Sequence, residues 1–200
     1  MNIPIIYEDE WLLVVDKPSG LLVIPTPKKE SRTLTSILGL HPCHRLDRET
    51  SGLIIYAKSK SIQQKVMDQF RQKNIKKTYI AFVSGIPFKP EGEIKVPIEG
   101  ATAITRYKVI EKRKDFAIVE VNPVTGRTNQ IRIHFKSIGH SVLGERKFAF
   151  RKDFTIKAKR LCLHAQDLKF LHPVTKQYIT LHSELPQDLK EFLAKYSVNR

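Results

Sequence analysis

The stretch His44-Arg45-Leu46-Asp47-Arg48-Glu49-Thr50-Ser51-Gly52-Leu53 is the most informative part of this chain. It places one carboxylate, Asp47, between two arginines, and a turn-like Thr-Ser-Gly segment and an apolar run to Ala57 follow. Nearby positive charges stabilise the ionised form of a carboxyl group. An ionised carboxylate in a loop ahead of a buried strand is a candidate nucleophile or base. The local charge pattern alone favours a simpler interpretation, an ion pair in a surface turn.

The composition indicates a single basic domain over residues 1–200. Hydrophobic residues make up 41% of the chain, which is enough to bury a core. Lys and Arg number 35 against 20 Asp and Glu, so the formal net charge is +15. Such a surface attracts polyanions, and nucleic acid is the partner that this charge favours. A basic protein without a polyanionic partner is the alternative that charge alone leaves open.

Cysteine usage and hydropathy exclude several classes of protein. Two cysteines, Cys43 and Cys162, are too few for a disulfide framework, and we expect both to be reduced and buried. Neither they nor the histidines near them form a paired C-x-x-C zinc motif. No signal peptide opens the chain, and no apolar run approaches the ~20 residues of a membrane span. We therefore expect a cytoplasmic protein without a membrane partner.

The order of expected elements predicts an α+β fold with a mixed, mainly antiparallel sheet flanked by helices and loops. Strands and helices do not alternate regularly, and no repeat or linker divides the chain. Strands are expected at 3–7, 11–15, 53–58, 76–84, 94–97, 105–111, 116–122, 161–170 and 177–182. Helices are expected at 33–40, from Ser59 or Ser61 to about 72, at 128–137 and at 185–196.

The ten-residue stretch around Asp47 resembles the catalytic motif of the RluA-type pseudouridine synthases, H-R-L-D followed two residues later by T-S-G-L. This resemblance implies that Asp47 is the catalytic aspartate of uridine isomerisation in RNA. The reaction cuts the bond from ribose C1′ to uracil N1, turns the base and joins C1′ to C5. It needs one carboxylate and no metal or redox cofactor. Whether Asp47 attacks the ribose, attacks the ring or removes a proton stays open.

Arg45 resembles the family arginine that enters the RNA stack where the target base leaves. A planar guanidinium suits that role because it stacks on bases and pairs with phosphates, and the base must leave its stack before chemistry. The alternative is a salt bridge to Asp47 or another acid. His44 is a candidate RNA contact through phosphate, but a structural loop histidine is the favoured interpretation.

Tyr79, in Lys77-Thr78-Tyr79-Ile80-Ala81, resembles the family tyrosine that stacks on the target uracil. An aromatic face offers a base ~1–3 kcal/mol of stacking. From this segment alone, a core tyrosine beside Phe82 and Val83 is the favoured interpretation. Its order after the Asp47 motif favours the site.

Gly126-Arg127-Thr128-Asn129-Gln130-Ile131-Arg132 resembles the family pattern G-R-x-H-Q-I-R/L-R. This resemblance implies that Arg127 pairs with the catalytic aspartate. The alternative is an arginine at a helix start, where the macrodipole disfavours a positive charge. Asn129 replaces the usual histidine, which changes the local hydrogen-bond network. Ile131 packs either beneath the uracil or in the core.

Further stretches match the family in order from about residue 6 to 195 and are interpreted as scaffold. They are Asp16–Leu21, Ile138–Gly144, Leu161–Ala165 and His172–Thr175. Because the match begins within the first ten residues, we expect a stand-alone catalytic domain without the S4-type RNA-binding domain of many members.

Two basic clusters are expected to serve the RNA. The first contains Lys60, Lys65, Arg71, Lys73, Lys76 and Lys77, and the second contains Arg146, Lys147, Arg151, Lys152, Lys157, Lys159 and Arg160. The second is the stronger candidate for phosphate contact, and we expect it to form a mobile loop that orders around RNA.

The sequence thus predicts a monomeric RNA pseudouridine synthase acting on rRNA or a tRNA stem-loop. The alternative function is a catalytically inactive RNA-binding or RNA-chaperone protein with the same fold. A serine hydrolase is disfavoured because no G-x-S-x-G motif occurs.

Overall fold

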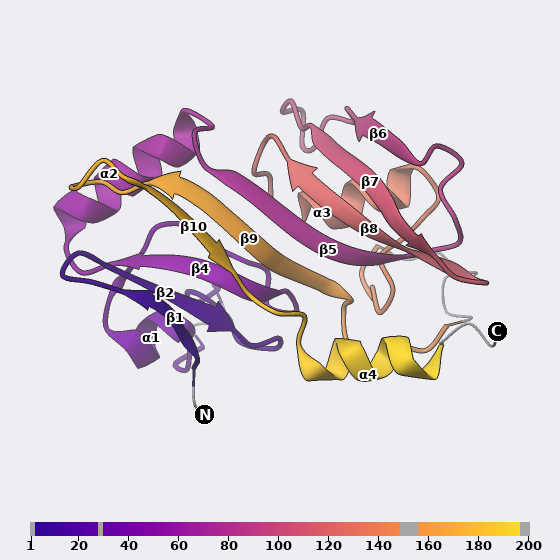
Figure 1. Ribbon diagram of the computed structural model, residues 1–200, viewed down its shortest axis with the longest axis horizontal. Helices are drawn as coiled ribbons and strands as arrows, with labels where there is room; N and C mark the ends of the chain where they lie inside the picture. The colour runs from indigo at the N-terminus through magenta and orange to yellow at the C-terminus, as the bar shows by residue number, and fades with distance from the viewer. Residues whose placement is uncertain (1–2, 28–29, 149–155, 197–200) are drawn as a thin grey trace. The chain divides into compact units, whose positions relative to one another are not determined.

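A computed structural model describes residues 3–27, 30–148 and 156–196, and it divides into two compact units. Unit 1 comprises Met1–Lys77 and Ala165–Glu184, and unit 2 comprises Thr78–His164 and Leu185–Arg200. Mainly antiparallel strands accompanied by helices confirm the α+β class (Figure 1). The single catalytic domain over residues 1–200 stays a prediction.

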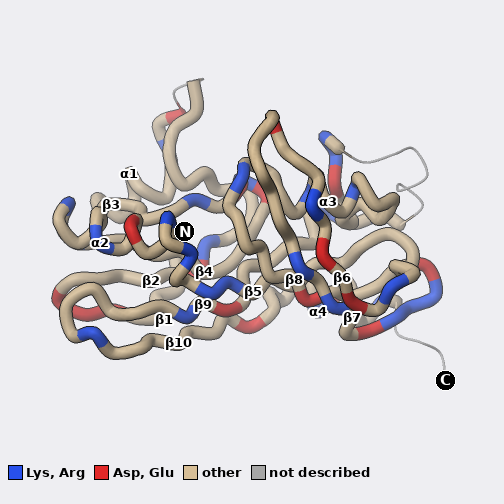
Figure 2. The backbone as a smooth tube through the Cα atoms, turned by 90° about the horizontal axis from the view of Figure 1, so that it is seen from above, with Lys and Arg blue, Asp and Glu red and all other residues tan. Residues whose placement is uncertain are grey.

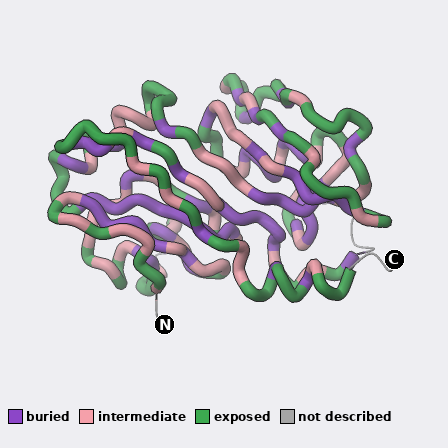
Figure 3. The backbone as a smooth tube through the Cα atoms, viewed as in Figure 1, coloured by how far each residue is buried: buried purple, intermediate pink, exposed green. Residues whose placement is uncertain are grey.

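The sheet of unit 1 contains a central, fully buried strand, β4. The neighbouring strands follow the order β1-β2-β4-β9, with β3 on β4 and β10 on β9. All seven residues of β4 are buried, because both of its faces are covered (Figure 3). The pairs β1–β2, β2–β4, β3–β4 and β9–β10 are antiparallel. The strands are β1 (Ile5–Glu8), β2 (Leu12–Lys17), β3 (His41–Pro42), β4 (Ser51–Ala57), β9 (Leu163–Leu171) and β10 (Tyr178–His182).

Two helices accompany this sheet, α1 (Leu34–Leu38) and α2 (Lys60–Arg71). Ser59 caps α2, since its side chain accepts a hydrogen bond from the Ile62 amide, and this settles the choice between Ser59 and Ser61. Ile62 and Val66 lie one helical turn apart and are buried in the same core cluster as Ile55. The apolar spacing that predicted the helix therefore also identifies its packed face.

Unit 2 contains an antiparallel sheet in the order β5-β8-β7-β6. The charged turn after Lys112 joins β7 to β8, as predicted, and the Arg113 amide donates to the Phe116 carbonyl at 2.8 Å. The elements are β5 (Lys76–Ser84), β6 (Glu91–Ile94), β7 (Thr105–Lys112), β8 (Phe116–Pro123), α3 (Gln130–Ser137) and α4 (Gln187–Lys195). Phe135 of α3 packs with Val119 and Val121 of β8, which forms the core of this unit.

Two local predictions were wrong. The strand expected at 94–97 runs instead from Glu91 to Ile94, although Gly92 lies within it. Tyr107 explains this, because its ring covers Gly92 and a Cβ atom there would lie 3.0 Å from the ring. Ser51 and Gly52 begin β4 and are not part of a turn. Gly52 has φ +119°, and a Cβ atom would lie 2.2 Å from the Ala165 carbonyl oxygen, so the close approach of the backbone requires glycine.

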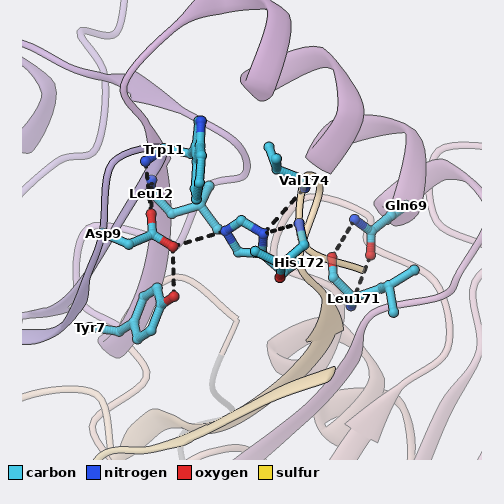
Figure 4. Close-up of polar contacts among 9 residues, drawn as sticks. Tyr7, Asp9, Trp11, Leu12, Gln69, Leu171, His172 and Val174 are labelled. Carbon is cyan, nitrogen blue, oxygen red and sulfur yellow. Dashed lines mark hydrogen bonds and ion pairs between the residues drawn. The ribbon is translucent and has the colours of Figure 1, made fainter. Parts of the chain in front are cut away.

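A polar network in unit 1 supports the scaffold role given to His172 (Figure 4). The His172 Nδ1 accepts from the amides of Val174 and Thr175, so the ring proton is on Nε2 and is donated to Asp9 at 2.9 Å. Tyr7 donates to the same carboxylate oxygen at 2.6 Å. Burial and this bond raise the pKa of Tyr7 to about 12. The network connects the β1–β2 hairpin to the end of β9.

Candidate active-site residues

Asp47 begins a tight turn in unit 1. The Thr50 amide donates to the Asp47 carbonyl oxygen at 3.2 Å, so Arg48 and Glu49 occupy the corners of the turn. Asp47 is half-buried, whereas Arg45 and Arg48 are exposed. An exposed Arg45 beside a half-buried carboxylate leaves the guanidinium accessible to a large ligand.

A segment about thirty residues earlier holds this turn by its backbone. The Arg48 carbonyl accepts from the Gly20 amide at 2.8 Å and from the Lys17 Nζ at 3.1 Å. The Ser19 hydroxyl donates to the Glu49 carbonyl at 2.6 Å. Lys17 is fully buried, and its Nζ also donates to two carbonyls close in sequence, those of Pro18 and Leu21. The sequence showed Asp16–Leu21 only as scaffold, and nothing in its local pattern indicated that it holds the Asp47 turn.

His44 has the contacts of a structural residue. Its Nε2 accepts from the Ile55 amide at 3.0 Å. The residue before it, Cys43, bonds the same strand residue through the backbone, its amide donating to the Ile55 carbonyl. The imidazole thereby takes the place of a strand carbonyl and ends the β3–β4 ladder. Burial, together with the nearby Lys77 ammonium, lowers the pKa of His44 to about 3. These contacts favour the structural interpretation over an RNA contact.

Tyr79 and Ile131 lie together in unit 2. Tyr79 is half-buried on β5 opposite Val121 and packs against the core cluster that contains Ile131 and Phe135. Ile131 is 6% exposed. This burial favours the core alternative for Ile131, whereas Tyr79 is only half-buried.

Arg127 lies in a turn ahead of α3, which begins at Gln130. The alternative interpretation, an arginine at the helix start, does not hold, and the argument from the macrodipole therefore falls away. The turn is fixed by Gln130, whose Oε1 accepts from the Arg127 amide at 3.0 Å and from the Thr125 hydroxyl at 2.6 Å. The Arg127 side chain is exposed, and its Nε donates to the Thr102 carbonyl at 3.1 Å.

Asn129 joins a buried ion pair. Its Oδ1 accepts from the Arg132 guanidinium at 2.7 Å, and that guanidinium also donates twice to the Glu145 carboxylate, at 2.5 and 2.9 Å. Burial alone would raise the pKa of Glu145, but the hydrogen bonds from Arg132 and the Lys147 amide hold it below its usual value. Asn129 therefore has a defined role in this chain's network.

The candidate residues fall into two sets. His44, Arg45 and Asp47 belong to unit 1, and Tyr79, Arg127 and Ile131 belong to unit 2. The residues of the first set lie close together in sequence, whereas in the second set Tyr79 and Ile131 share a packed cluster and Arg127 lies in an exposed turn. The pairing of Arg127 with Asp47 stays a prediction.

Lys and Arg residues are distributed over both units (Figure 2). In the first basic cluster five side chains are exposed, whereas Lys77 is half-buried and burial lowers its pKa. Arg71 of this cluster pairs with Asp68 at 2.5 Å. In the second, Arg160 pairs with Asp188 at 2.6 Å, while residues 149–155 of the expected mobile loop, which include Arg151 and Lys152, lie outside the described residues.

Neither a metal centre nor a membrane span was found in the described part of the chain. Over residues 3–27, 30–148 and 156–196, no three His, Cys, Asp or Glu side chains are grouped to hold a metal ion. Within the same ranges, no helix is long and apolar enough to cross a bilayer. Cys43 and Cys162 are buried, as expected, and burial raises the pKa of each thiol to about 12.

Residues 11–137 match the family model described as RNA pseudouridylate synthase. The chain belongs to the RNA pseudouridylate synthase family. A relative from Haemophilus influenzae, the dual-specificity RNA pseudouridine synthase RluA, is 35% identical over 90% of this chain and 92% of its own length. The uncharacterized RNA pseudouridine synthase YlyB of Bacillus subtilis is 34% identical over 100% of this chain and 74% of its own.

Solved structures of pseudouridine synthases have the same fold. Human RNA pseudouridylate synthase domain containing 4 superposes with a TM-score of 0.84 and 24% identity, covering 96% of this chain and 92% of that one. Together with the family match, these relatives identify an isomerase that converts uridine in RNA to pseudouridine. The predictions of family, fold and enzyme class are confirmed.

Proposed function

We propose that Asp47 supplies the catalytic carboxylate of this pseudouridine synthase. The observation that carries the proposal is the turn that begins at Asp47, in which three donors from Lys17, Ser19 and Gly20 fix the carbonyls of the next two residues. A fixed backbone holds a reacting group in position before substrate arrives, which lowers the entropic part of the barrier.

The reaction is an isomerisation, so its atoms balance without a co-reactant. The C1′–N1 bond breaks, C1′ joins C5, and the proton on C5 leaves while N1 gains one. One carboxylate can serve as the nucleophile and as the base for such a sequence. The proposal does not specify whether Asp47 attacks the ribose, attacks the uracil ring or removes the proton.

The remaining candidates act around the target nucleotide. Arg45, which is exposed, occupies the space left by the flipped uridine. Tyr79 offers its half-buried ring to the uracil, and Arg127 pairs with the Asp47 carboxylate. This arrangement requires the two units to act as one catalytic domain over residues 1–200.

The substrate that we propose is an rRNA hairpin or a tRNA stem-loop. The names of the relatives support this class, since they include a dual-specificity RNA pseudouridine synthase and the ribosomal large subunit pseudouridine synthase C of Vibrio cholerae. Proteins reach RNA bases in loops and single strands, where bases can be splayed out. Exposed lysines on and beside α2 supply cations for phosphate. We further propose that the enzyme acts as a monomer in the cytoplasm.

Asp47→Asn tests the assignment. We expect loss of pseudouridine formation with RNA affinity and stability retained, since the amide keeps the size of a half-buried side chain but not its charge. Carbodiimide primer extension of tRNA and rRNA, from cells lacking the gene and complemented with each variant, measures product directly.

Asp115→Asn is the matched control, because Asp115 is an exposed aspartate in the β7–β8 turn. It should restore every site that the wild type restores. Pseudouridine formation by Asp47→Asn would refute the assignment of Asp47 as the catalytic carboxylate. Sites unchanged by deletion of the gene would favour an inactive RNA-binding protein.

A further inference from the structure

Unit 2 contains a cavity of about 340 Å³ that involves none of the proposed catalytic residues. It lies between the β5–β6 connection, strands β6 and β7, and the segment after α3, and we call it the distal pocket. Its lining includes Phe88, Lys89, Ile94, Tyr107, Ile138 and His140. Because all of these belong to one unit, the pocket is complete within that unit.

The inner wall of the distal pocket is rigid and apolar. Ile94 and Tyr107 are 4% and 9% exposed. The Tyr107 ring is held from two sides: it covers Gly92, and it meets Phe135 edge-to-face at 5.5 Å between centroids. A side chain so confined presents a preformed surface, which lowers the entropy lost when a ligand binds.

Phe88 is almost completely exposed at 98%. Ile138, which lines the pocket from the segment after α3, is 36% exposed. A single exposed apolar residue needs no explanation, but here a free aromatic ring adjoins a formed apolar cavity. Such a ring is a stacking platform for a planar group, and a nucleobase gains ~1–3 kcal/mol from such a contact.

One polar side chain in the lining, His140, offers an acceptor for an N–H group of a base. The His140 Nδ1 lies 2.8 Å from the Ser84 carbonyl oxygen. Because a carbonyl only accepts, Nδ1 carries the proton, and in the neutral ring Nε2 is an acceptor for an N–H group. A hydrophobic cavity with one or two directional polar groups is typical of a small-molecule or base site.

The charge around the pocket fits a polyanion. Glu93 is bound by both Lys95 and Arg106, each at 2.7 Å, and hydrogen bonds from these two cations lower its pKa. Lys89, in the lining itself, adds a further positive charge. Three cations against two carboxylates of β6, Glu91 and Glu93, leave a positive balance that favours phosphate groups beside the pocket, as expected for RNA and not for an acidic or neutral peptide.

We propose that the distal pocket binds one unpaired nucleobase of the substrate RNA, other than the target uridine, stacked on Phe88. This assignment rests on the proposed function, because it takes the ligand to be the RNA that the enzyme modifies. The pocket then contributes to choosing which RNA is bound, and it takes no part in the chemistry.

Phe88→Ala is the decisive variant, and Phe88 is so exposed that its removal leaves the fold intact. We expect the Kd for the RNA identified by the mapping experiment to rise about tenfold, with kcat at saturating RNA unchanged. Phe88→Trp should keep the affinity of the wild type, because it retains an aromatic ring at this position. Ile110→Ala is the matched control, because Ile110 is another exposed apolar side chain of unit 2, 50% exposed and outside the pocket.

Phe88→Trp also supplies a direct signal for stacking. Its fluorescence, after subtraction of the wild-type signal from Trp11, should be quenched by poly(A) and not by inorganic polyphosphate, which offers phosphates without bases. Equal quenching by both would overturn the proposal, as would an unchanged Kd for Phe88→Ala. A dimer in sedimentation that Phe88→Ala dissociates would assign the pocket to self-association and overturn it too.

The two proposals fail separately. Identical affinity and turnover of the wild type and Phe88→Ala would refute the role proposed for the distal pocket and leave the proposed isomerase activity unaffected. Absence of pseudouridine formation by the wild type would refute the proposed function. Quenching of Phe88→Trp fluorescence by poly(A) but not by polyphosphate would still support a base-binding site.

Discussion

The Asp47 turn of unit 1 and the Arg127 turn of unit 2 are fixed in different ways. The first is held from a distance, by Lys17 and Ser19, which precede it by about thirty residues. The second is held from within, by Gln130, the first residue of the following helix. Both devices satisfy backbone groups with side chains. In the first, the donors come from a segment about thirty residues away, whereas in the second the acceptor is a neighbour in sequence that is itself anchored to Ile104 and Thr105. The difference means that the two turns should respond separately to mutation.

The largest effect is expected from removing the distant support. Lys17→Met keeps the length of a buried side chain but removes the ammonium that donates to three carbonyl oxygens. The Arg48 carbonyl keeps its bond from the Gly20 amide, whereas those of Pro18 and Leu21 lose their side-chain donor. We expect the free energy of unfolding to fall by about 3 kcal/mol, because buried acceptors that lose a charged donor are costly. Urea denaturation measures this. Lys169→Met, an exposed lysine on β9 of the same unit, should change stability by less than about 0.5 kcal/mol.

Removing the internal support should have a smaller and more local effect. Gln130→Leu loses two accepted bonds and two donated bonds, the latter to the Ile104 carbonyl and the Thr105 hydroxyl, each at 2.9 Å. We expect a loss of about 2 kcal/mol. Hydrogen exchange should accelerate at the Arg127 amide and stay unchanged at the Thr50 amide. Equal acceleration at both amides would show that the turns are coupled, contrary to this comparison.

His44 makes the Asp47 turn sensitive to acid. Its pKa is about 3 in the folded state and about 6.5 when unfolded. Between these values the unfolded chain binds more protons, so stability is full above pH 6.5 and is lost as pH falls. From pH 6.5 to pH 5 the loss is about 2 kcal/mol.

His44→Gln keeps an acceptor for the Ile55 amide and does not titrate. Its stability should therefore fall less than that of the wild type over the same pH range, as followed by thermal unfolding. Parallel pH profiles for the two proteins would contradict the assignment. The Arg127 turn contains no comparable group.

The smallest effect on stability is expected from Thr50, at the end of the Asp47 turn. Its hydroxyl is buried and has no hydrogen-bond partner among the residues that the structure describes. Thr50→Val removes this unsatisfied group with little change of shape, so stability should rise by about 1 kcal/mol. Thr102→Val, at an exposed threonine, serves as control. A drop in the melting temperature of Thr50→Val would reveal a partner for the hydroxyl.

Elements with local signals were predictable from the sequence. Ser59 capping α2, the apolar spacing of Ile62 and Val66, and the β7–β8 hairpin all follow from neighbouring residues. The family resemblance identified the candidate residues before any geometry was known. What failed depended on distant parts of the chain. Gly92 is tolerated in β6 because Tyr107 covers it, and Gly52 is required in β4 because Ala165 approaches it.

The candidate site was predictable in its residues and less so in their surroundings. Nothing local indicated that Lys17 is buried and donates to the Arg48 carbonyl, because lysine is most often exposed. Similarly, the pattern around Arg127 suggested a helix start, but the helix begins at Gln130 once that side chain closes the turn. A hydrogen bond from a side chain to a distant backbone group has no local sequence pattern, so the residues that fix these turns could not be predicted.

Unit 1 is built from two segments of the chain, Met1–Lys77 and Ala165–Glu184. During synthesis, the strand that follows β4 in its sheet order, β9, emerges only after all of residues 78–164 have been made. β9 begins about 106 residues after β4 ends, so at about 5–20 residues per second β4 waits about 5–21 s for that neighbour. Throughout that interval a strand that is buried in the folded protein lacks its β9 neighbour along one edge, which is a site for misassociation. A nascent chain of this enzyme should consequently depend on a chaperone until its last quarter has been translated.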